Sequence, residues 1–231
     1  MKTAVVTGAS SGIGLSISRS LIGIGYKVYG LSRSIKNVDF IHDNFIKLTC
    51  NLSRTRELLA SIEHIKANEK EIHVLVNNAG VGFFGPHEQI KPGQIEQMVA
   101  TNLQAPLIIS SLLLRELRKT RGYIINISSI TAKKSSTHGA AYAATKAGLS
   151  HFAASLFDET RKSGIKVVTI HPDMTKTDFY RNSDFKEGSD PESYITAECV
   201  SDAVEYVLSR RTGTVVSDIT VRPQKHMIER K

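Results

Sequence analysis

The feature that most restricts the fold is an alternation, along nearly the whole chain, of short apolar runs with longer segments of helical periodicity. The predicted strands are residues 3–6, 27–31, 45–48, 72–76, 123–127, 165–170 and 215–221. Helical spacing of apolar residues covers 13–24, 53–66, 92–119, 142–162 and 196–209. Because strands that alternate with helices form parallel sheets covered on both faces, we predict an α/β fold. The expected architecture is a three-layer, doubly wound parallel sheet (Rossmann-like) of about seven strands.

The chain length of 231 residues suits one domain, and no repeat, low-complexity tract or linker divides it. Residues 1–231 are therefore predicted to form a single domain. Pro106 is expected to cause an irregularity in the long helical segment 92–119. Thr196 is the candidate N-cap of the last helix. Residues 173–195 are polar and irregular, and we expect a loop there.

Charge and cysteine usage disfavour several functional classes. The formal charge is +8, but the basic residues are spread along the chain and no Lys/Arg block exceeds two neighbours, so no nucleic-acid partner is expected. Cys50 and Cys199 match no metal or redox spacing, which predicts a reducing cytoplasm and no metal site. No signal-peptide pattern opens the chain. The longest apolar stretch, Leu103–Leu114, is interrupted by polar residues, so no membrane association is expected.

A glycine-rich turn joins the first predicted strand to the first predicted helix. It reads Thr7-Gly8-Ala9-Ser10-Ser11-Gly12-Ile13-Gly14. Glycines at such a turn let the backbone approach a pyrophosphate, and the free amides and dipole of the helix N-terminus favour the anion. The turn therefore predicts a dinucleotide site.

The end of the second strand indicates which dinucleotide is bound. An acidic residue that binds the ribose 2′-hydroxyl of NAD is expected about 20 residues after the glycines. The chain has Leu31-Ser32-Arg33 there, without Asp or Glu. Because Arg33 can pair with a 2′-phosphate that an acid would repel, NADP (NADPH) is favoured over NAD. A solvated Arg33 without a ligand is the alternative.

Tyr142 and Lys146 form the candidate catalytic pair. They are four residues apart in a predicted helix, so both side chains lie on one face. An ammonium beside a phenol favours the phenolate, and the pKa of Tyr142 is therefore expected to be lowered. Ser129, just after the fifth strand, is placed to offer a hydroxyl to the same substrate oxygen. Taken alone, a surface Tyr-Lys pair would explain the spacing equally well.

Five motifs in order resemble the short-chain dehydrogenase/reductase family, in its single-domain form, over about Lys2–Val221. They are the TGxxxGxG loop at Thr7–Gly14, the NNAG turn at Asn77–Gly80, the helix Asn at Asn102, the Ser at Ser129, and the YxxxK pair Tyr142 and Lys146. A chance match of five ordered motifs is improbable.

The resemblance implies an NADP-dependent oxidoreductase that transfers hydride between the nicotinamide and a carbonyl or secondary alcohol. It implies that Tyr142 is the general acid/base and that Ser129 donates a hydrogen bond to the substrate oxygen. Lys146 would lower the pKa of Tyr142 and bind the nicotinamide ribose. Asn102 would hold a water molecule of the proton relay. The implied cofactor-binding residues are Gly8, Ser10, Ser11, Gly12, Ile13, Gly14, Arg33, Asn51, Leu52, Asn78, Ala79, Gly80, Tyr142, Lys146, Pro172, Thr175 and Thr177.

Three departures from the family pattern stand out. Asn51-Leu52 replaces Asp-Leu beside the adenine, where an amide can still accept a hydrogen bond. Pro172-Asp173 replaces Pro-Gly, and glycine tolerates backbone angles that Asp tolerates less well. Asp173 is either a residue that steers a polar or cationic substrate or a surface Asp without a role. The chain also lacks the C-terminal motif of family members that reduce 3-oxoacyl thioesters.

The substrate site is predicted to include His138, Asp173 and Phe179, with the loop 173–195 as a closing lid. The resemblance also implies pairing of helices 92–119 and 142–162 in a homodimer or homotetramer; burial of both faces inside one subunit is the alternative. The leading interpretation is a cytoplasmic carbonyl reductase of a small molecule. A 3-oxoacyl thioester (acyl carrier protein) reductase and a non-catalytic NADP-sensing regulator remain alternatives.

Overall fold

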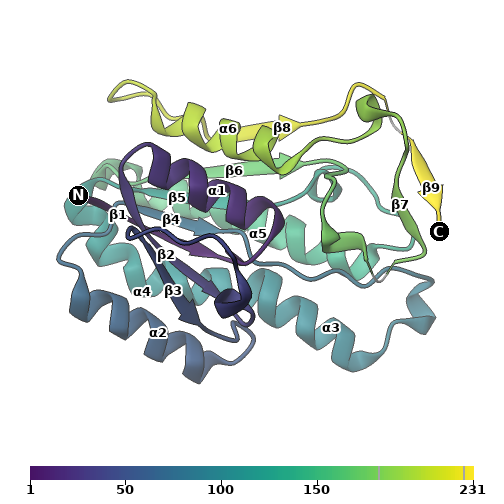
Figure 1. Cartoon of the computed structure of the whole chain (residues 1–231), viewed down its shortest axis with the longest axis horizontal. Helices are drawn as coiled ribbons and strands as arrows, with labels where there is room; N and C mark the ends of the chain where they lie inside the picture. Colours follow the sequence, from purple (N-terminus) through teal and green to yellow (C-terminus); the bar gives the residue numbers. More distant parts are fainter. Residues whose placement is uncertain (182, 226) are drawn as a thin grey trace.

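The computed structural model describes residues 1–181, 183–225 and 227–231; residue 182 falls inside the predicted loop 173–195. Its main element is a sheet of seven parallel strands in the order β3-β2-β1-β4-β5-β6-β8 (Figure 1). The strands are β1 (Lys2–Thr7), β2 (Tyr26–Ser32), β3 (Phe45–Thr49), β4 (Val74–Asn77), β5 (Tyr123–Ile127), β6 (Lys166–Pro172) and β8 (Asp218–Val221). The predicted doubly wound α/β sheet is confirmed.

Helices cover both faces of this sheet because its central strands are apolar on both sides. They are α1 (Gly12–Gly23), α2 (Thr55–Asn68), α3 (Pro92–Val99), α4 (Ala105–Thr120), α5 (Ala140–Thr160) and α6 (Ala197–Leu208). In Figure 1, α1 and α6 lie on one side of the sheet, and α2 and α4 on the other.

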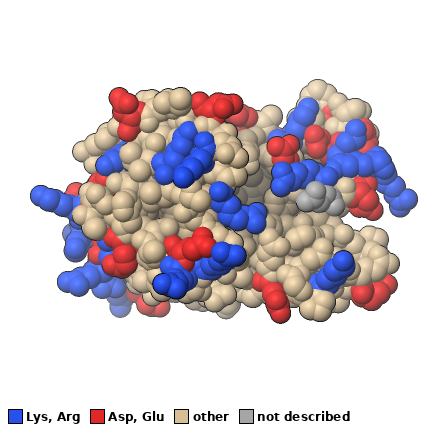
Figure 2. Space-filling model, turned by 60° about the horizontal axis from the view of Figure 1, so that its bottom comes forward, with Lys and Arg blue, Asp and Glu red and all other residues tan. Residues whose placement is uncertain are grey.

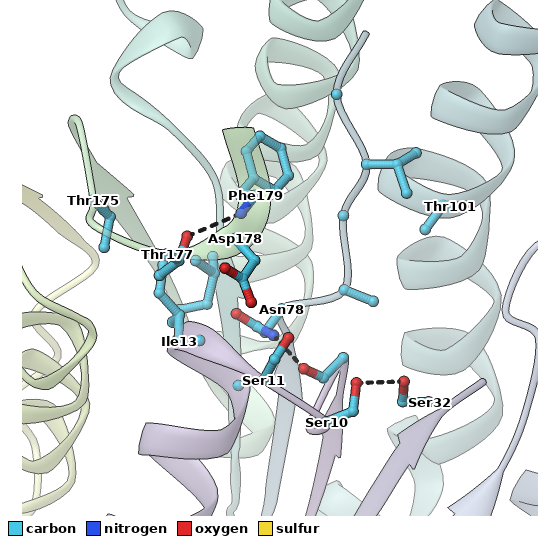
Figure 3. Close-up of a pocket in the computed structure, with 18 of the residues that line it drawn as sticks. Ser10, Ser11, Ile13, Ser32, Asn78, Thr101, Thr175, Thr177, Asp178 and Phe179 are labelled. Carbon is cyan, nitrogen blue, oxygen red and sulfur yellow. Dashed lines mark hydrogen bonds between the residues drawn. The ribbon is translucent and has the colours of Figure 1, made fainter. Parts of the chain in front are cut away.

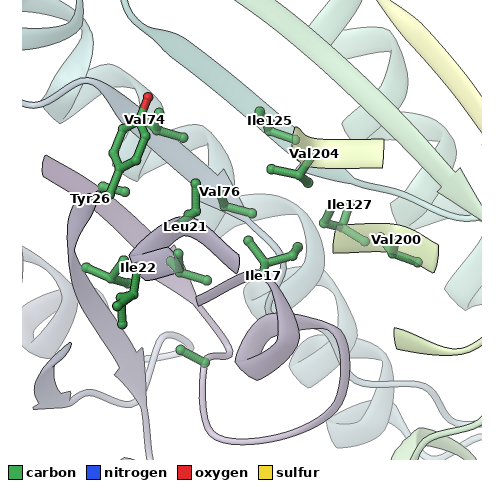
Figure 4. Close-up of a cluster of buried hydrophobic side chains, with 14 of the residues drawn as sticks. Ile17, Leu21, Ile22, Tyr26, Val74, Val76, Ile125, Ile127, Val200 and Val204 are labelled. Atoms are coloured by element: carbon green, nitrogen blue, oxygen red, sulfur yellow. The ribbon is translucent and has the colours of Figure 1, made fainter. Parts of the chain in front are cut away.

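Two apolar cores follow from the period-two alternation of each strand. In β1, Val6 joins the core under α1 and α6, whereas Val5 joins the core under α2, α4 and α5. Figure 4 shows the first core, where Ile17 and Leu21 of α1 and Val204 of α6 meet the side chains of β4 and β5. Burial of this kind contributes roughly 1.5–3 kcal/mol for each large aliphatic side chain.

The long helical segment contains the predicted irregularity, directly before the proline. Residues Ala100–Gln104 form a π-helical turn, η3, which continues into α4. Pro106, in the first turn of α4, has no N–H to donate back into η3, and its ring crowds the carbonyl four residues earlier. By length and composition alone, the helical stretch Pro92–Thr120 could cross a membrane. However, Ile109, Leu113 and Leu117 are fully buried in the core beneath the sheet.

Helices 92–119 and 142–162 were predicted to pair between subunits. Most of their apolar side chains are buried inside the subunit instead. Leu113 is fully buried, and Leu112, Phe152 and Phe157 are partly buried against the same core. The oligomeric state therefore stays a prediction.

The chain also forms a small second sheet that the sequence patterns did not predict. In it, β7 (Phe185–Glu187), inside the segment expected to be irregular, pairs antiparallel with β9 (Ile228–Arg230) near the end of the chain. Figure 1 shows these two strands at one end of the molecule, apart from the main sheet.

Candidate active site

A cleft of about 500 Å³ lies at the carboxyl ends of the main strands. Open parallel sheets bind ligands at this edge, since the loops there leave a crevice. Every residue predicted to contact the cofactor lines it: Gly8, Ser10, Ser11, Gly12, Ile13, Gly14, Arg33, Asn51, Leu52, Asn78, Ala79, Gly80, Tyr142, Lys146, Pro172, Thr175 and Thr177. The cleft thus brings together segments that lie far apart in the sequence.

The glycine-rich turn can exist only with glycine at its key positions. Gly8 and Gly12 have positive φ angles of 69° and 50°. A Cβ on Gly14 would lie 2.2 Å from the carbonyl oxygen of Gly8, which no side chain tolerates. Asn78 fixes the turn, because its Nδ2 donates to the carbonyl oxygen of Thr7 at 2.9 Å. The turn thus forms a backbone cradle at the start of α1 that fits a pyrophosphate.

Hydroxyl groups and one guanidinium line the cleft at the end of β2. Figure 3 shows Ser10 and Ser32 side by side, with their Oγ atoms 2.8 Å apart. Ser34 Oγ donates to Ser10 Oγ at 3.2 Å. The exposed Arg33 lines the same stretch of the cleft. This group of donors has the chemistry that a ribose 2′-phosphate requires.

Ser129, Tyr142 and Lys146 meet deeper in the cleft, and all three are buried. Lys146 Nζ donates to the carbonyl oxygen of Ile127 at 2.8 Å and lies 5.8 Å from the centre of the Tyr142 ring. Ser129 Oγ accepts from the backbone N–H of Thr131 at 3.1 Å, which fixes its orientation. The predicted catalytic trio therefore shares one site.

The expected lowering of the pKa of Tyr142 is wrong for this structure. Burial raises the pKa of Tyr142 above its ordinary value of 10.0, Tyr180 adds to the rise, and the Ser129 hydroxyl opposes it. Burial also lowers the pKa of Lys146 to about 8. The ammonium is therefore costly in this setting, and its hydrogen bond goes to Ile127 rather than to the phenol.

Asn102 lies in the π-helical turn and is not among the residues that line the cleft. Its Nδ2 donates to the carbonyl oxygen of Val81 at 2.8 Å and to Thr145 Oγ1 at 3.1 Å. Its Oδ1 accepts from the N–H of Val81 at 2.8 Å. Asn102 thus ties the loop after β4 to α5, which carries Tyr142.

Asp173 is not a surface residue, because only 8% of it is exposed. Its Oδ1 accepts from the N–H of Met174 at 2.9 Å, and its Oδ2 from Arg222 Nε at 3.3 Å. Asp173 is absent from the described non-glycine residues with positive φ, so the replacement of glycine causes no strain there. The carboxylate that was considered for substrate steering is already paired with a guanidinium.

Three other sequence candidates have distinct positions. Phe179 lines the cleft, and its N–H donates to Thr177 Oγ1 at 3.3 Å (Figure 3). Asn51 Oδ1 already accepts from Ser53 Oγ at 2.8 Å, in addition to facing the cleft. His138 is exposed, has a φ of 60° and is not among the lining residues, so it does not reach the site.

His171 is a further residue of the site that sequence reasoning missed. It is 1% exposed and lies on β6. Its Nδ1 is 3.1 Å from the carbonyl oxygen of Ser129, and its Nε2 is 2.8 Å from Asp218 Oδ2. The ring connects the main chain of Ser129 to β8. A histidine within an apolar strand, just before the proline that ends it, was the available signal.

Surface charge and metal-binding chemistry add little to the site. On the face in Figure 2, Lys and Arg side chains lie in several groups with Asp and Glu between them. Among residues 1–181, 183–225 and 227–231, no three His, Cys, Asp or Glu side chains are grouped to hold a metal ion.

Comparisons with known proteins agree with this geometry. The family model described as short chain dehydrogenase matches residues 2–188. The 3-oxoacyl-[acyl-carrier-protein] reductase FabG of Salmonella typhimurium is 35% identical over 185 residues, covering 78% of this chain and 76% of the relative.

Solved structures give the same result. A metagenomic short-chain oxidoreductase in complex with NADP has a TM-score of 0.82 at 30% identity, covering 97% of this chain and 98% of its own. A 3-ketoacyl-(acyl-carrier-protein) reductase from Brucella melitensis complexed with NADH has a TM-score of 0.86 at 21% identity, with 98% of both chains covered, and supports the fold.

Proposed function

Because the chain belongs to the short-chain dehydrogenase family, and is therefore an oxidoreductase with a nicotinamide cofactor, we propose that it is an NADPH-dependent carbonyl reductase in which Tyr142 moves the proton. The observation that carries the proposal is the meeting of Ser129, Tyr142 and Lys146 in the same cleft as the glycine cradle. The bound cofactor supplies the hydride, and the protein supplies orientation and proton transfer.

Tyr142 is the proton donor to the substrate oxygen in the direction of reduction. Burial keeps its hydroxyl protonated in the cofactor-free protein, so a proton is available for the substrate oxygen. Ser129 donates a hydrogen bond to the same oxygen. Lys146 changes its charge near neutral pH, since its pKa is lowered to about 8, and it returns a proton toward the tyrosine after turnover.

The preference for NADPH rests on the end of β2. Arg33 and the hydroxyls of Ser10, Ser32 and Ser34 line the position expected for the ribose 2′ substituent. A phosphate there would accept charge-assisted hydrogen bonds that a free hydroxyl cannot form. A carboxylate that would bind the hydroxyl of NAD is missing from Leu31-Ser32-Arg33-Ser34.

A second candidate function is the reduction of a 3-oxoacyl thioester. The 35% identity to the Salmonella reductase is the observation in its favour. The non-catalytic regulator has no observation of this kind, because the Tyr-Lys pair is retained in the cleft.

The test is oxidation of NADPH and NADH by the purified protein with a panel of ketones, 3-keto acids, dicarbonyls and one 3-oxoacyl thioester. Tyr142→Phe should lower turnover by roughly 10²- to 10⁴-fold, and NADPH should still bind because the glycine cradle is unchanged. Tyr206→Phe, at a tyrosine that is 49% exposed on α6, is the matched control. Undiminished turnover in Tyr142→Phe would remove Tyr142 as the acid. A preference for NADH over NADPH would refute the use of Arg33.

A further inference from the structure

Aromatic rings surround Tyr142, the proposed proton donor. The ring centre of Tyr142 lies 5.3 Å from that of Phe84 and 5.7 Å from that of Phe179. Tyr180 and Phe185 extend the group, since both lie within 5.8 Å of Phe84. These five side chains, here named the aromatic cluster, come from the loop after β4, from α5 and from the segment 173–195.

Close packing holds the cluster together. Phe179 and Tyr180 are 5.1 Å apart in edge-to-face geometry, and Tyr180 and Phe185 are 5.2 Å apart. Gly82 permits this packing, because a Cβ there would lie 2.6 Å from the Phe84 ring and 3.0 Å from the Phe179 ring. Each such pair stabilises the cluster beyond the burial of its area.

Only part of the aromatic cluster reaches the cleft. Tyr142, Phe179 and Tyr180 line it, whereas Phe84 and Phe185 pack against these rings and are not among the lining residues. Burial raises the pKa of Tyr180 to about 12, with smaller contributions from Asp173 and Glu187, so its hydroxyl is neutral at physiological pH.

Three charged residues line the cleft close to these rings in the chain. Asp173 is buried and paired with Arg222, and Asp178 and Arg181 are exposed. The wall beside Tyr142 therefore offers mainly ring faces and edges to a substrate.

Strand β9 and Lys231 contact the backbone of the segment that carries these rings. Strand β9 pairs with β7, with Arg230 opposite Phe185. The backbone N–H of Lys231 donates to the carbonyl oxygen of Asp184 at 2.8 Å, and its Nζ donates to that of Tyr180 at 2.7 Å. Two ring-bearing residues of the cluster are thereby fixed by the last residues of the same chain.

We propose that the aromatic cluster, braced by β9, makes this enzyme selective for compact carbonyl compounds with a flat, uncharged substituent, such as aryl ketones and aryl aldehydes. A flat ring that enters the site replaces a ring–ring contact of the cluster by an equivalent contact of its own. A flexible acyl chain separates the rings and restores no such contact. The inference rests on the proposed carbonyl reductase function. It predicts that 3-oxoacyl thioesters are poorer substrates than aryl ketones.

The test compares acetophenone with cyclohexyl methyl ketone, which have similar size but differ in planarity. The measured quantity is the ratio of their kcat/KM values with NADPH. Phe179→Leu, at a ring that lines the cleft, and Phe84→Leu, at a ring packed against it, should each lower this ratio by roughly two- to tenfold relative to the unchanged enzyme. Phe157→Leu, at a ring on α5 outside the cluster, should leave the ratio unchanged and serves as the control.

Removal of residues 228–231 is the second variant, because it keeps every ring and deletes only the brace. It should also lower the ratio, and it should raise KM for acetophenone more than it lowers kcat. An unchanged ratio in all three variants, or acetoacetyl thioester as the best substrate, would overturn the inference and leave the reductase proposal standing. Absence of NADPH oxidation with every carbonyl would instead refute the proposed function, and the inference with it.

Discussion

Lys146 lies in an environment very different from water. It is 3% exposed, and its ammonium donates to the carbonyl oxygen of Ile127. Burial in such surroundings disfavours the charged form, which lowers the pKa from 10.5 to about 8. The buried ammonium therefore lowers the stability of the cofactor-free protein.

This cost predicts how stability depends on pH. Between pH 8 and about 10, the native protein has released the Lys146 proton while the unfolded chain keeps it. Because the unfolded state binds more protons there, the free energy of unfolding should rise with pH, by at most about 1.4 kcal/mol per pH unit. Tyr142, whose pKa is raised above 10.0, opposes this rise only at higher pH.

The measurement is urea unfolding of the cofactor-free protein and of Lys146→Met at pH 7.5, 8.5 and 9.5. The unfolding free energy of the unchanged protein, minus that of Lys146→Met, should increase with pH. Lys162→Met removes an exposed lysine and corrects for the loss of one charge. A difference that stays constant with pH would contradict the buried-ammonium account.

At the scale of elements, the turn from β1 into α1 connects sequence and function most directly. Gly14 is in contact with the backbone of Gly8 and with the side chain of Asn78. Helix α1 cannot move away, because Ile17 and Leu21 are fully buried against the sheet. The cradle therefore depends on glycine at this position of the helix.

Gly14→Ala should abolish cofactor binding and lower stability by about 1–3 kcal/mol, since the new methyl group overlaps the Gly8 carbonyl. The matched control is Gly23→Ala at the other end of α1, where a Cβ meets no atom within 4 Å. That change should be neutral or stabilising by up to about 1 kcal/mol. Fluorescence titration with NADPH and thermal unfolding measure both effects. Cofactor binding by Gly14→Ala at normal affinity would show that the cradle is not the binding element.

Most strands could be predicted from the sequence, but β7 could not. The seven main strands follow apolar runs whose side chains alternate between two cores, so local pattern was sufficient. The site residues followed from ordered motifs at the ends of those strands. Strand β7 was missed because Phe185–Glu187 is short and charged, and only its pairing with β9, some forty residues later, makes it a strand.

Other misses have the same cause. The pKa of Tyr142 was judged from its neighbour in the helix, but burial by rings from distant segments decides it. The helix irregularity expected at Pro106 is a π-helical turn at Ala100–Gln104, directly before the proline, and its form was not predicted because it places Asn102 on the loop after β4. Tertiary contacts, which a single sequence does not display, determine each of these features.

At the scale of the whole molecule, the cleft depends on both halves of the sheet. Its walls come from the ends of β1 and β2 on one side and of β5 and β6 on the other, with β4 between them. A dinucleotide bound along it contacts both halves at once. Its binding free energy should therefore stabilise the entire fold rather than one segment.

This linkage gives a test of cofactor preference that needs no substrate. At 100 times its dissociation constant, NADPH should add about 2.7 kcal/mol to the free energy of unfolding. For a chain of this size that raises Tm by about 5–10 °C. NADH at the same concentration should raise Tm less, because it cannot pair with Arg33 through a 2′-phosphate. Arg33→Asp should remove or reverse the difference, because a carboxylate repels the 2′-phosphate of NADPH and can accept a hydrogen bond from the ribose 2′-hydroxyl of NADH. Equal shifts from both cofactors in the unchanged protein would mean that the hydroxyls and guanidinium at the end of β2 do not discriminate between them.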